Sequence, residues 1–362
     1  MKVFITGGTG FIGSRVLEKL VARGDEVYAL ARSERSAAAV EALGAHAVRG
    51  ELGDVAALRA GMQGCDVVFH IAAWYKLGAN DPAKMSSINV GGTLNVLRTA
   101  HEVGVPKIVY TSSVAVFGDT HGHIADETFY QGPPFLTDYD RTKWRAHYEV
   151  AVPLIEQGAP IVIVMPGAVY GPGDHSLVGE LMTWFYRGWL FFTPGVETML
   201  AYAHVDDIAE GHILAADKGG VGESYLLVGP ALTMGELVAL WSDITGKRHP
   251  FFGVPAKWLL PLAPFIGAIE HVLPLPSLFC RDSIAILGAT YIARADKARA
   301  ELGWSPRPLR DGMRETFDAI AGTLPPPPAP VQRRRRLACA AIGVAIAALG
   351  LWLVRHRDKP DV

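Results

Sequence analysis

The stretch KVFITGGTGFIG (Lys2–Gly13) decides the fold. Its first five residues predict a short apolar strand, and Gly7, Gly10 and Gly13 then follow immediately before a segment with helical spacing. Glycine permits a tight turn and lets the backbone approach a pyrophosphate, which rests on the positive end of the next helix. We therefore predict a dinucleotide-binding strand–turn–helix unit. The alternative is an ordinary strand-to-helix turn without a ligand.

The remainder of the first half repeats this alternation of strand and helix. Short apolar runs recur at residues 26–30, 46–50, 66–72, 107–112 and 161–166. Between them, segments such as 13–24 and 91–104 have apolar residues at helical spacing. This order predicts βαβ units and an α/β fold with a Rossmann-type doubly wound parallel sheet.

The end of the second predicted strand indicates which dinucleotide binds. NAD-binding chains place a carboxylate there, which binds the ribose 2′-hydroxyl. This sequence instead has Ala31, Arg32, Ser33 and Arg35. Because arginine binds phosphate through paired donors, we predict NADP(H) over NAD(H). Arginines of a solvated loop are the alternative.

A tyrosine and a lysine lie four residues apart in DYDRTKWRAH (Asp138–His147). In a helix, the side chains of Tyr139 and Lys143 are neighbours, and a nearby cation lowers the pKa of a phenol. This pair predicts a general acid. Alone it is also typical of two polar side chains on an exposed helix.

Two serines, Ser112 and Ser113, end the fifth predicted strand in YTSSVAVFG (Tyr110–Gly118), at the sheet edge where open α/β folds bind ligands. Together with the glycine motif and YDRTK, this arrangement resembles the extended short-chain dehydrogenase/reductase family. The resemblance covers roughly residues 1–320. It includes the further motifs HIAA (70–73), NVGGTLN (89–95), PGAVYGPGD (166–174) and HVDD (204–207).

The resemblance implies a role for each matching residue. Ser113 would donate a hydrogen bond to the reacting oxygen, with Ser112 as the adjacent alternative. Tyr139 would exchange a proton with that oxygen, and Lys143 would lower the tyrosine pKa and bind the nicotinamide ribose. Asn89 would support the lysine through the backbone or a water molecule. Besides Asn89, Ser112, Tyr139 and Lys143, the implied cofactor-binding residues are Gly7, Thr9, Gly10, Phe11, Ile12, Gly13, Arg32, Arg35, Glu51, Leu52, Ala72, Ala73, Pro166, Gly167 and Val169.

Other positions differ from the family or have a structural interpretation. Many relatives have aspartate at Glu51 and arginine at Met165, and the missing charge at Met165 makes a nucleotide-sugar substrate less favourable. His204 and Asp206 are expected to cap the next helix. His70 is expected near the cofactor without chemistry. His175 is expected on an exposed loop.

Composition excludes several classes of protein. The formal net charge of −2 gives no support to nucleic-acid binding. Cys65, Cys280 and Cys339 lie far apart, so they form no metal-ligand spacing and fit a reducing compartment. No metal site is predicted. The N-terminus enters a strand at once, which leaves no room for a secretory leader, so the globular part is expected in the cytoplasm.

The C-terminal segment predicts a membrane anchor. Four arginines (333–336) precede an uncharged apolar stretch at 337–354, which as a helix would span about 27 Å. A buried soluble helix is the alternative. The prolines at 325–330 predict an extended spacer. We expect a single-pass anchor with the catalytic domain in the cytoplasm.

The predicted domains are a Rossmann core at 1–170 with a return segment at about 200–228, a smaller substrate subdomain at 171–322, a Pro-rich and basic linker at 323–336, and a transmembrane helix at 337–354.

The predicted function combines the catalytic and cofactor-binding residues implied by the resemblance with two apolar segments. The segments 182–192 and 257–276 are rich in aromatic and aliphatic residues, which line an apolar pocket or simply pack a core. We predict hydride transfer to or from a secondary alcohol or ketone on a sterol-, hopanoid- or isoprenoid-like substrate. The alternatives are a nucleotide-sugar epimerase or dehydratase that retains its cofactor, and a non-catalytic membrane-tethered scaffold. By analogy, a homodimer is expected.

Overall fold

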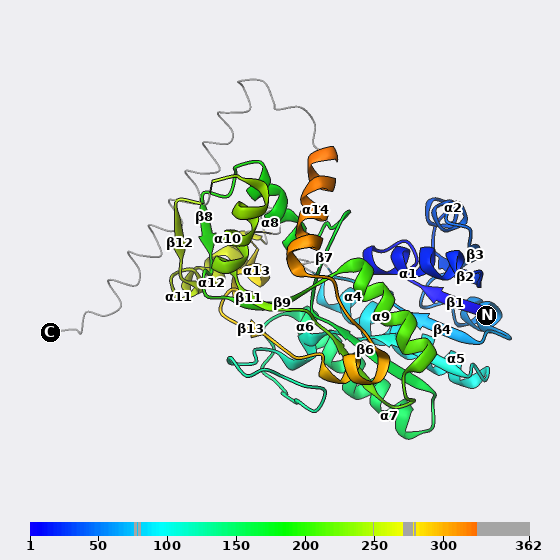
Figure 1. The fold of residues 1–362 in the computed structure, drawn as a ribbon. Coiled ribbons are helices and arrows are strands. Elements are labelled where there is room, and N and C mark those ends of the chain that lie inside the picture. The colour runs from blue at the N-terminus through cyan, green and yellow to red at the C-terminus, as the bar shows by residue number, and fades with distance from the viewer. Residues whose placement is uncertain (76–77, 79–80, 249, 271–277, 279, 324–362) are drawn as a thin grey trace. The chain divides into compact units, whose positions relative to one another are not determined.

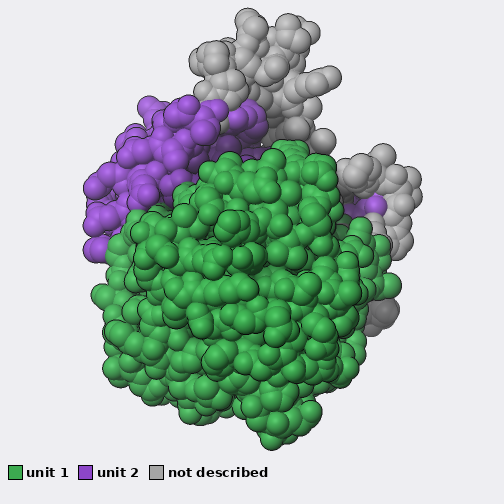
Figure 2. All heavy atoms as spheres, turned by 90° about the vertical axis from the view of Figure 1, so that its right-hand side faces the viewer, with its two compact units in different colours: residues 1–169, 201–230, 291–307 green, residues 170–200, 231–290, 308–362 purple. Residues whose placement is uncertain are grey.

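The computed structural model describes residues 1–323 apart from 76–77, 79–80, 249, 271–277 and 279. Figure 2 colours the two units into which the chain divides. Unit 1 comprises residues 1–169, 201–230 and 291–307, and unit 2 comprises 170–200, 231–290 and the described residues from 308 onward. Every residue predicted for catalysis or cofactor binding belongs to unit 1.

A sheet of seven parallel strands forms the centre of unit 1, in the order β10-β6-β5-β4-β1-β2-β3 (Figure 1). The predicted parallel α/β fold is therefore confirmed. The strand order reverses between β1 and β4, which creates the crevice where such sheets bind ligands. The strands are β1 (Lys2–Thr6), β2 (Glu26–Ala31), β3 (His46–Arg49), β4 (Val67–His70), β5 (Lys107–Thr111), β6 (Ile161–Pro166) and β10 (Ser224–Leu227).

Helices cover both faces of this sheet. α1 packs against α9 on one face, and α3, α5 and the helix that contains α6 lie on the other (Figure 1). All residues of β4 and β6 are buried, which explains why their sequences are continuous apolar runs. The helices of unit 1 are α1 (Phe11–Ala22), α2 (Glu34–Ala42), α3 (Val55–Met62), α4 (Pro82–Ser86), α5 (Thr93–Glu102), α6 (Asp138–Arg145), α7 (Val152–Glu156) and α9 (Val205–Lys218).

Shorter helical segments complete unit 1. The 3₁₀ turn η2 (Val114–Phe117) follows β5, and the π-helical η6 (Ala298–Leu302) lies in the last segment of the unit. The π-helical η1 (Ser87–Gly92) joins α4 to α5, and the π-helical η3 (Ala146–Ala151) joins α6 to α7. One continuous helix therefore runs over residues 138–156. π-Helical turns inside α-helices are frequent near functional sites.

Unit 2 has its own core. Phe185 of α8 (Leu177–Tyr186), Trp241 of α10 (Met234–Thr245) and Phe317 of α14 (Leu309–Thr323) form an aromatic cluster with ring centroids 5.6 to 6.0 Å apart. Part of the apolar segment 182–192 therefore packs a core. β8 (Phe192–Pro194) pairs with β12 (Phe252–Val254), and the remaining helices are α11 (Ala256–Leu259), η4 (Leu260–Leu262), α12 (Ala263–Glu270) and α13 (Arg281–Ile286).

Four short strands lie at or next to the points where the chain passes between units. They are β7 (Ala168–Tyr170), β9 (Met199–His204), β11 (Ala231–Thr233) and β13 (Thr290–Tyr291).

The predicted membrane span lies outside the described residues, because these end at residue 323. In the part of the chain that the structure describes, no helix is both long enough and apolar enough to cross a bilayer.

Candidate active site

The glycine loop between β1 and α1 has the geometry of a phosphate cradle. Gly7 has φ +80°, and a Cβ there would lie 2.7 Å from the backbone nitrogen of Ala72. A Cβ on Gly13 would lie 2.0 Å from the carbonyl oxygen of Gly7. At the N-cap, Gly10 supplies no capping side chain, so the first backbone N–H groups of α1, including those of Phe11 and Ile12, face the loop as donors. These residues fit a bound pyrophosphate.

The loop after β4 lies against this cradle and is held by a chain of hydrogen bonds through His70. Thr93 Oγ1 donates to the carbonyl oxygen of Asn89 at 2.6 Å, so it accepts from His70 Nε2 at 3.0 Å. The imidazole proton is therefore on Nε2, and Nδ1 accepts from the Thr6 hydroxyl at 2.8 Å. The backbone N–H of Ala72 in turn donates to Thr6 Oγ1 at 3.3 Å.

The electrostatics of His70 agree with this assignment. Burial and the nearby charge of Lys143 lower the pKa of His70 to about 3. It is thus a neutral structural group that fixes the segment with Ala72 and Ala73. This location supports the prediction that His70 lies near the cofactor without chemistry.

The end of β2 exposes the two arginines predicted to bind a 2′-phosphate. Ser33 caps α2 in a capping box with Ser36, which explains why the helix begins immediately after the strand. Arg32 and Arg35 are exposed, and no described residue forms a hydrogen bond or an ion pair with either guanidinium. Both are free to bind an anion.

The positions predicted near the adenine lie in the turn after β3. Glu51 is exposed, and Leu52 packs beside Gly92, where a Cβ would lie 2.8 Å from the leucine side chain. The carbonyl oxygen of Leu52 accepts a 3.0 Å hydrogen bond from Asn95 Nδ2.

Tyr139 and Lys143 are on one face of α6, as their spacing predicts. Thr137 and Asp140 form a capping box that starts the helix two residues before Tyr139. Lys143 is 3% exposed, and its Nζ donates a 2.7 Å hydrogen bond to the carbonyl oxygen of Thr111, the last residue of β5.

The two predicted serines have different partners. The Ser113 side chain lies near the Tyr139 hydroxyl and acts to lower its pKa. Ser112 is buried, and its hydroxyl lies 2.8 Å from His147 Nδ1. Of the two, Ser113 is the serine that influences the pKa of the tyrosine expected to exchange the proton.

The expected lowering of the Tyr139 pKa is not seen. Burial raises the pKa of Tyr139 to about 12; the Ser113 side chain opposes this shift and the Asp140 carboxylate adds to it. Burial also lowers the pKa of Lys143 to about 7, so the ammonium is only partly charged at neutral pH. A lysine that is partly neutral and donates to Thr111 has little charge with which to stabilise a phenolate.

Asn89 contacts the residue next to Lys143 and the loop after β4. Its Nδ2 donates to Thr142 Oγ1 at 3.1 Å, one residue before Lys143. The same amide forms two hydrogen bonds with the backbone of Trp74: Oδ1 accepts from the N–H at 2.6 Å, and Nδ2 donates to the carbonyl oxygen at 3.2 Å. Asn89 thus ties the loop after β4 to α6. Next to Trp74, the Tyr75 ring packs edge-on against the Tyr139 ring, with 4.8 Å between centroids.

The residues predicted at the end of β6 lie beside these serines. The backbone N–H of Ser112 donates to the carbonyl oxygen of Val164 at 2.8 Å. Pro166 ends β6, and Gly167 follows in a site so tight that a Cβ would lie 2.6 Å from a backbone oxygen. Val169 continues in β7. Met165 is buried within β6.

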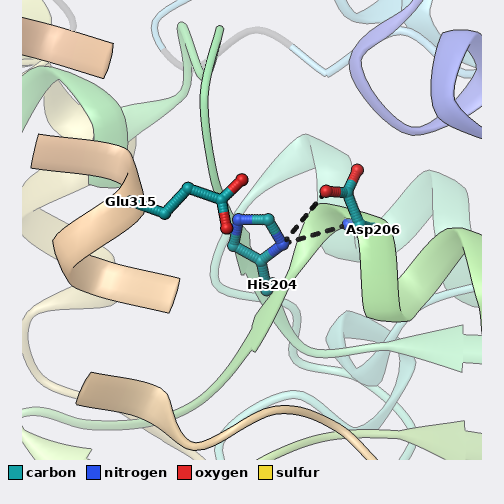
Figure 3. A group of neighbouring side chains, drawn as sticks. All are labelled: His204, Asp206 and Glu315. Carbon is teal, nitrogen blue, oxygen red and sulfur yellow. Dashed lines mark hydrogen bonds and ion pairs between the residues drawn. The ribbon is translucent and has the colours of Figure 1, made fainter. Parts of the chain in front are cut away.

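The expected capping role of His204 is confirmed. His204 is the N-cap of α9, and its Nδ1 accepts a 3.3 Å hydrogen bond from the N–H of Asp206 (Figure 3). The third side chain drawn there, Glu315, belongs to α14 of unit 2. His175 is exposed, as expected.

Two buried histidines in the site were missed from the sequence. His147 contacts Ser112, and His212 of α9 accepts from or donates to the Thr111 hydroxyl at 2.9 Å while its Nδ1 contacts the carbonyl oxygen of Ile208. Since a carbonyl only accepts, Nδ1 of His212 carries the proton and Thr111 donates to Nε2. The signal for His147 was available, because it follows Lys143 by the same four residues that separate Lys143 from Tyr139.

Comparison with known proteins agrees with this geometry. Residues 3–227 match the NAD dependent epimerase/dehydratase family. The chain belongs to this family. The resemblance to the extended short-chain dehydrogenases/reductases and the prediction of an enzyme that uses a nicotinamide dinucleotide for oxidation or reduction are thereby confirmed.

Individual members of the epimerase/dehydratase family match nearly the whole chain. The sterol demethylase protein B of Methylococcus capsulatus is 30% identical over 328 residues, which cover 89% of this chain and 98% of that protein. The 4-hydroxy-2-methyl-3-oxo-4-farnesyl-3,4-dihydroquinoline-1-oxide ketoreductase of Stigmatella aurantiaca is 31% identical over 336 residues, covering 90% and 99%. The crystal structure of gox2253 is 34% identical with a TM-score of 0.75, covering 88% of this chain and 98% of that one.

Proposed function

We propose that this protein transfers a hydride between NADP(H) and a secondary alcohol or ketone on an apolar, sterol- or isoprenoid-like substrate. The observation that carries the proposal is the contact between the Ser113 and Tyr139 side chains at the carboxyl edge of the sheet, with Lys143 buried one turn along the helix. A hydroxyl donor and a phenol beside a dinucleotide-binding crevice are what carbonyl reduction requires.

The bound dinucleotide supplies the hydride in reduction and accepts it in oxidation. The chain's own groups control the proton. With its pKa at about 12, the Tyr139 phenol is protonated at neutral pH and is ready to donate to the alkoxide oxygen that reduction creates. Ser113 donates a hydrogen bond to the same oxygen. These protonation states favour reduction near neutral pH, and the oxidation reaction becomes more favourable as the pH rises.

Cofactor preference rests on the end of β2. Arg32 and Arg35 are exposed, have no partner among the described residues, and follow a strand that ends in Ala31 instead of a carboxylate. A 2′-phosphate would find paired donors there. Affinity measurements for NADPH and NADH test this part directly.

Two observations support an apolar substrate. Two similar proteins are named for a sterol and for a farnesyl-bearing ketone. In addition, the half-exposed Tyr75 ring packs on the Tyr139 ring, so an aromatic surface borders the reacting hydroxyl. An apolar ring or chain would pack on this surface.

We also propose that residues 337–354 anchor the chain to a membrane, with the catalytic units on the cytoplasmic side. An anchor would place the site beside substrates that partition into lipid. Fractionation of cells that express the full chain and a chain ending at residue 323 tests it, because only the full chain should sediment with membranes. A homodimer is proposed by analogy and is testable by light scattering.

The decisive experiment offers the purified full chain a panel of two ketones and one nucleotide sugar with NADPH or NADH, follows the absorbance of the reduced nicotinamide, and separates the products by chromatography. The panel contains a 3-keto sterol, a farnesyl ketone and UDP-glucose. Oxidation of NADPH with an apolar ketone supports the proposal. Conversion of UDP-glucose without added cofactor would replace it with the epimerase, and a chain that binds cofactor but turns over none of the panel would favour a scaffold.

A further inference from the structure

His147 extends the active-site face of the helix over residues 138–156 by one more turn. Tyr139, Lys143 and His147 follow one another at intervals of four residues, so their side chains are on the same side. His147 is 5% exposed, and its Nδ1 lies 2.8 Å from the hydroxyl of Ser112, which is 3% exposed.

These three helix residues contact three consecutive residues at the end of β5. Lys143 donates to the carbonyl oxygen of Thr111, and Tyr139 lies near the side chain of Ser113. His147 bonds Ser112, which lies between them. We refer to these three contacts as the helix–strand ladder.

The ladder matters for Ser113 because the contacts of the strand end with β6 and α9 hold Thr111 and Ser112, whereas the backbone and side-chain contacts of Ser113 with Val116 and Ala115 lie within its own η2 turn. On β6, the carbonyl oxygen of Val164 accepts the Ser112 N–H. On α9, His212 accepts the Thr111 hydroxyl. Ser113 itself begins the η2 turn, where its side chain also accepts from the N–H of Ala115. The position of Ser112 therefore sets where the η2 turn begins, and with it the position of the Ser113 hydroxyl.

An imidazole suits this position because it stays uncharged beside an ammonium. Burial and the charge of Lys143 lower the pKa of His147 to about 4, so the ring is neutral at ordinary pH. A neutral ring holds the serine without competing with Lys143 for the carbonyl of Thr111.

We propose that His147 is a positioning residue, which orients the Ser113 hydroxyl toward the reacting oxygen by holding the neighbouring Ser112. The inference rests on the proposed carbonyl reduction, because the reacting oxygen is the one that Ser113 and Tyr139 share. It assigns no proton transfer to His147 itself.

The test compares kcat, KM and cofactor affinity of four single variants of the full chain, the double variant His147→Leu/Ser112→Ala, and Tyr139→Phe. His147→Leu keeps the volume and removes the hydrogen bond, and Ser112→Ala removes the other partner. His147→Asn is the rescue variant, because an amide group replaces Nδ1 and either donates or accepts. Val150→Ala is the matched control, since Val150 is buried in the same η3 turn and loses only packing.

His147→Leu and Ser112→Ala are each expected to lower kcat by roughly tenfold, less than the ~100-fold that a ~1 Å misplacement of a reacting group produces. Dissociation constants for the cofactor should stay unchanged. Because the two side chains act as one unit, the double variant should lose no more than either single variant. His147→Asn should restore most of the wild-type kcat, and Val150→Ala should lower the thermal midpoint without lowering kcat.

Three results would overturn the inference. They are an unchanged kcat in His147→Leu, losses that multiply in the double variant, and a Val150→Ala variant that loses as much kcat as His147→Leu at equal loss of stability. Tyr139→Phe separates this inference from the proposed function. If Tyr139→Phe stays active, the reaction chemistry is wrong; if it is inactive while His147→Leu is normal, only the role of His147 is wrong.

Discussion

Replacing Lys143 by methionine should make the stability of the protein less dependent on pH. The folded-state pKa of Lys143 is about 7, lowered from 10.5 by burial. Between these values the unfolded chain binds a proton that the folded chain has released, so the free energy of unfolding rises with pH. The wild type gains this stability as the pH increases, whereas the methionine variant has no such group.

The magnitude follows from the same shift. One pH unit is worth ~1.4 kcal/mol per proton, and about half of Lys143 is already deprotonated near pH 7. Raising the pH from about 7 to about 9 should therefore increase the free energy of unfolding of the wild type by roughly 2 kcal/mol more than that of Lys143→Met. Loss of the hydrogen bond from Lys143 to Thr111 also changes the difference in free energy of unfolding between the two proteins. Most of the pH-dependent part of that difference comes from titration of the lysine.

Urea unfolding of both proteins over a pH series measures this difference. Lys107→Met is the matched control, because Lys107 also donates to a backbone carbonyl, that of Gly219, but is only half-buried. Its curve should run parallel to that of the wild type. A wild-type minus Lys143→Met difference that stays constant or falls with pH would refute the account of a buried lysine whose charge opposes folding.

Three further variants test the cofactor site and its supports. Gly13→Ala should abolish NADPH binding measured by fluorescence titration, because its Cβ would lie 2.0 Å from a backbone oxygen of the loop; unaltered affinity would contradict the cradle. Replacing Arg32 and Arg35 by serine should weaken NADPH binding by roughly tenfold or more and leave NADH binding nearly unchanged. Equal effects on both cofactors would remove the case for a 2′-phosphate site. Asn89→Ala should lower the free energy of unfolding by about 1–3 kcal/mol, because the Trp74 backbone loses its partner, and a negligible loss in urea titration would contradict this.

The sequence predicted the sheet and the glycine loop correctly because both depend on local chemistry. Continuous apolar runs specify strands buried on two faces, and the six predicted strands all occur. At Gly7 and Gly13 the close backbone contacts exclude any side chain, so the turn requires glycine at these positions and the glycine spacing predicts it. The i, i+4 spacing likewise placed Tyr139 and Lys143 on one helix face.

The burial of side chains and their long-range partners could not be predicted from the sequence in the same way. The sequence suggested that a neighbouring cation lowers the pKa of Tyr139, but burial of both groups raises the pKa of the phenol and lowers that of Lys143. The hydrogen bonds by which Asn89 joins two segments distant in sequence could not be predicted from its motif. The partner of His147 depends on where β5 ends against the helix, which only the fold determines.

The central claim is that the Tyr139 hydroxyl supplies the proton in carbonyl reduction. The most direct measurement compares kcat of the wild type and Tyr139→Phe with an apolar ketone and NADPH, together with the cofactor dissociation constants. The account predicts that kcat falls by roughly 10²- to 10⁴-fold while the affinity for NADPH is retained. A Tyr139→Phe variant that binds NADPH normally and reduces the ketone at nearly the wild-type rate would contradict it.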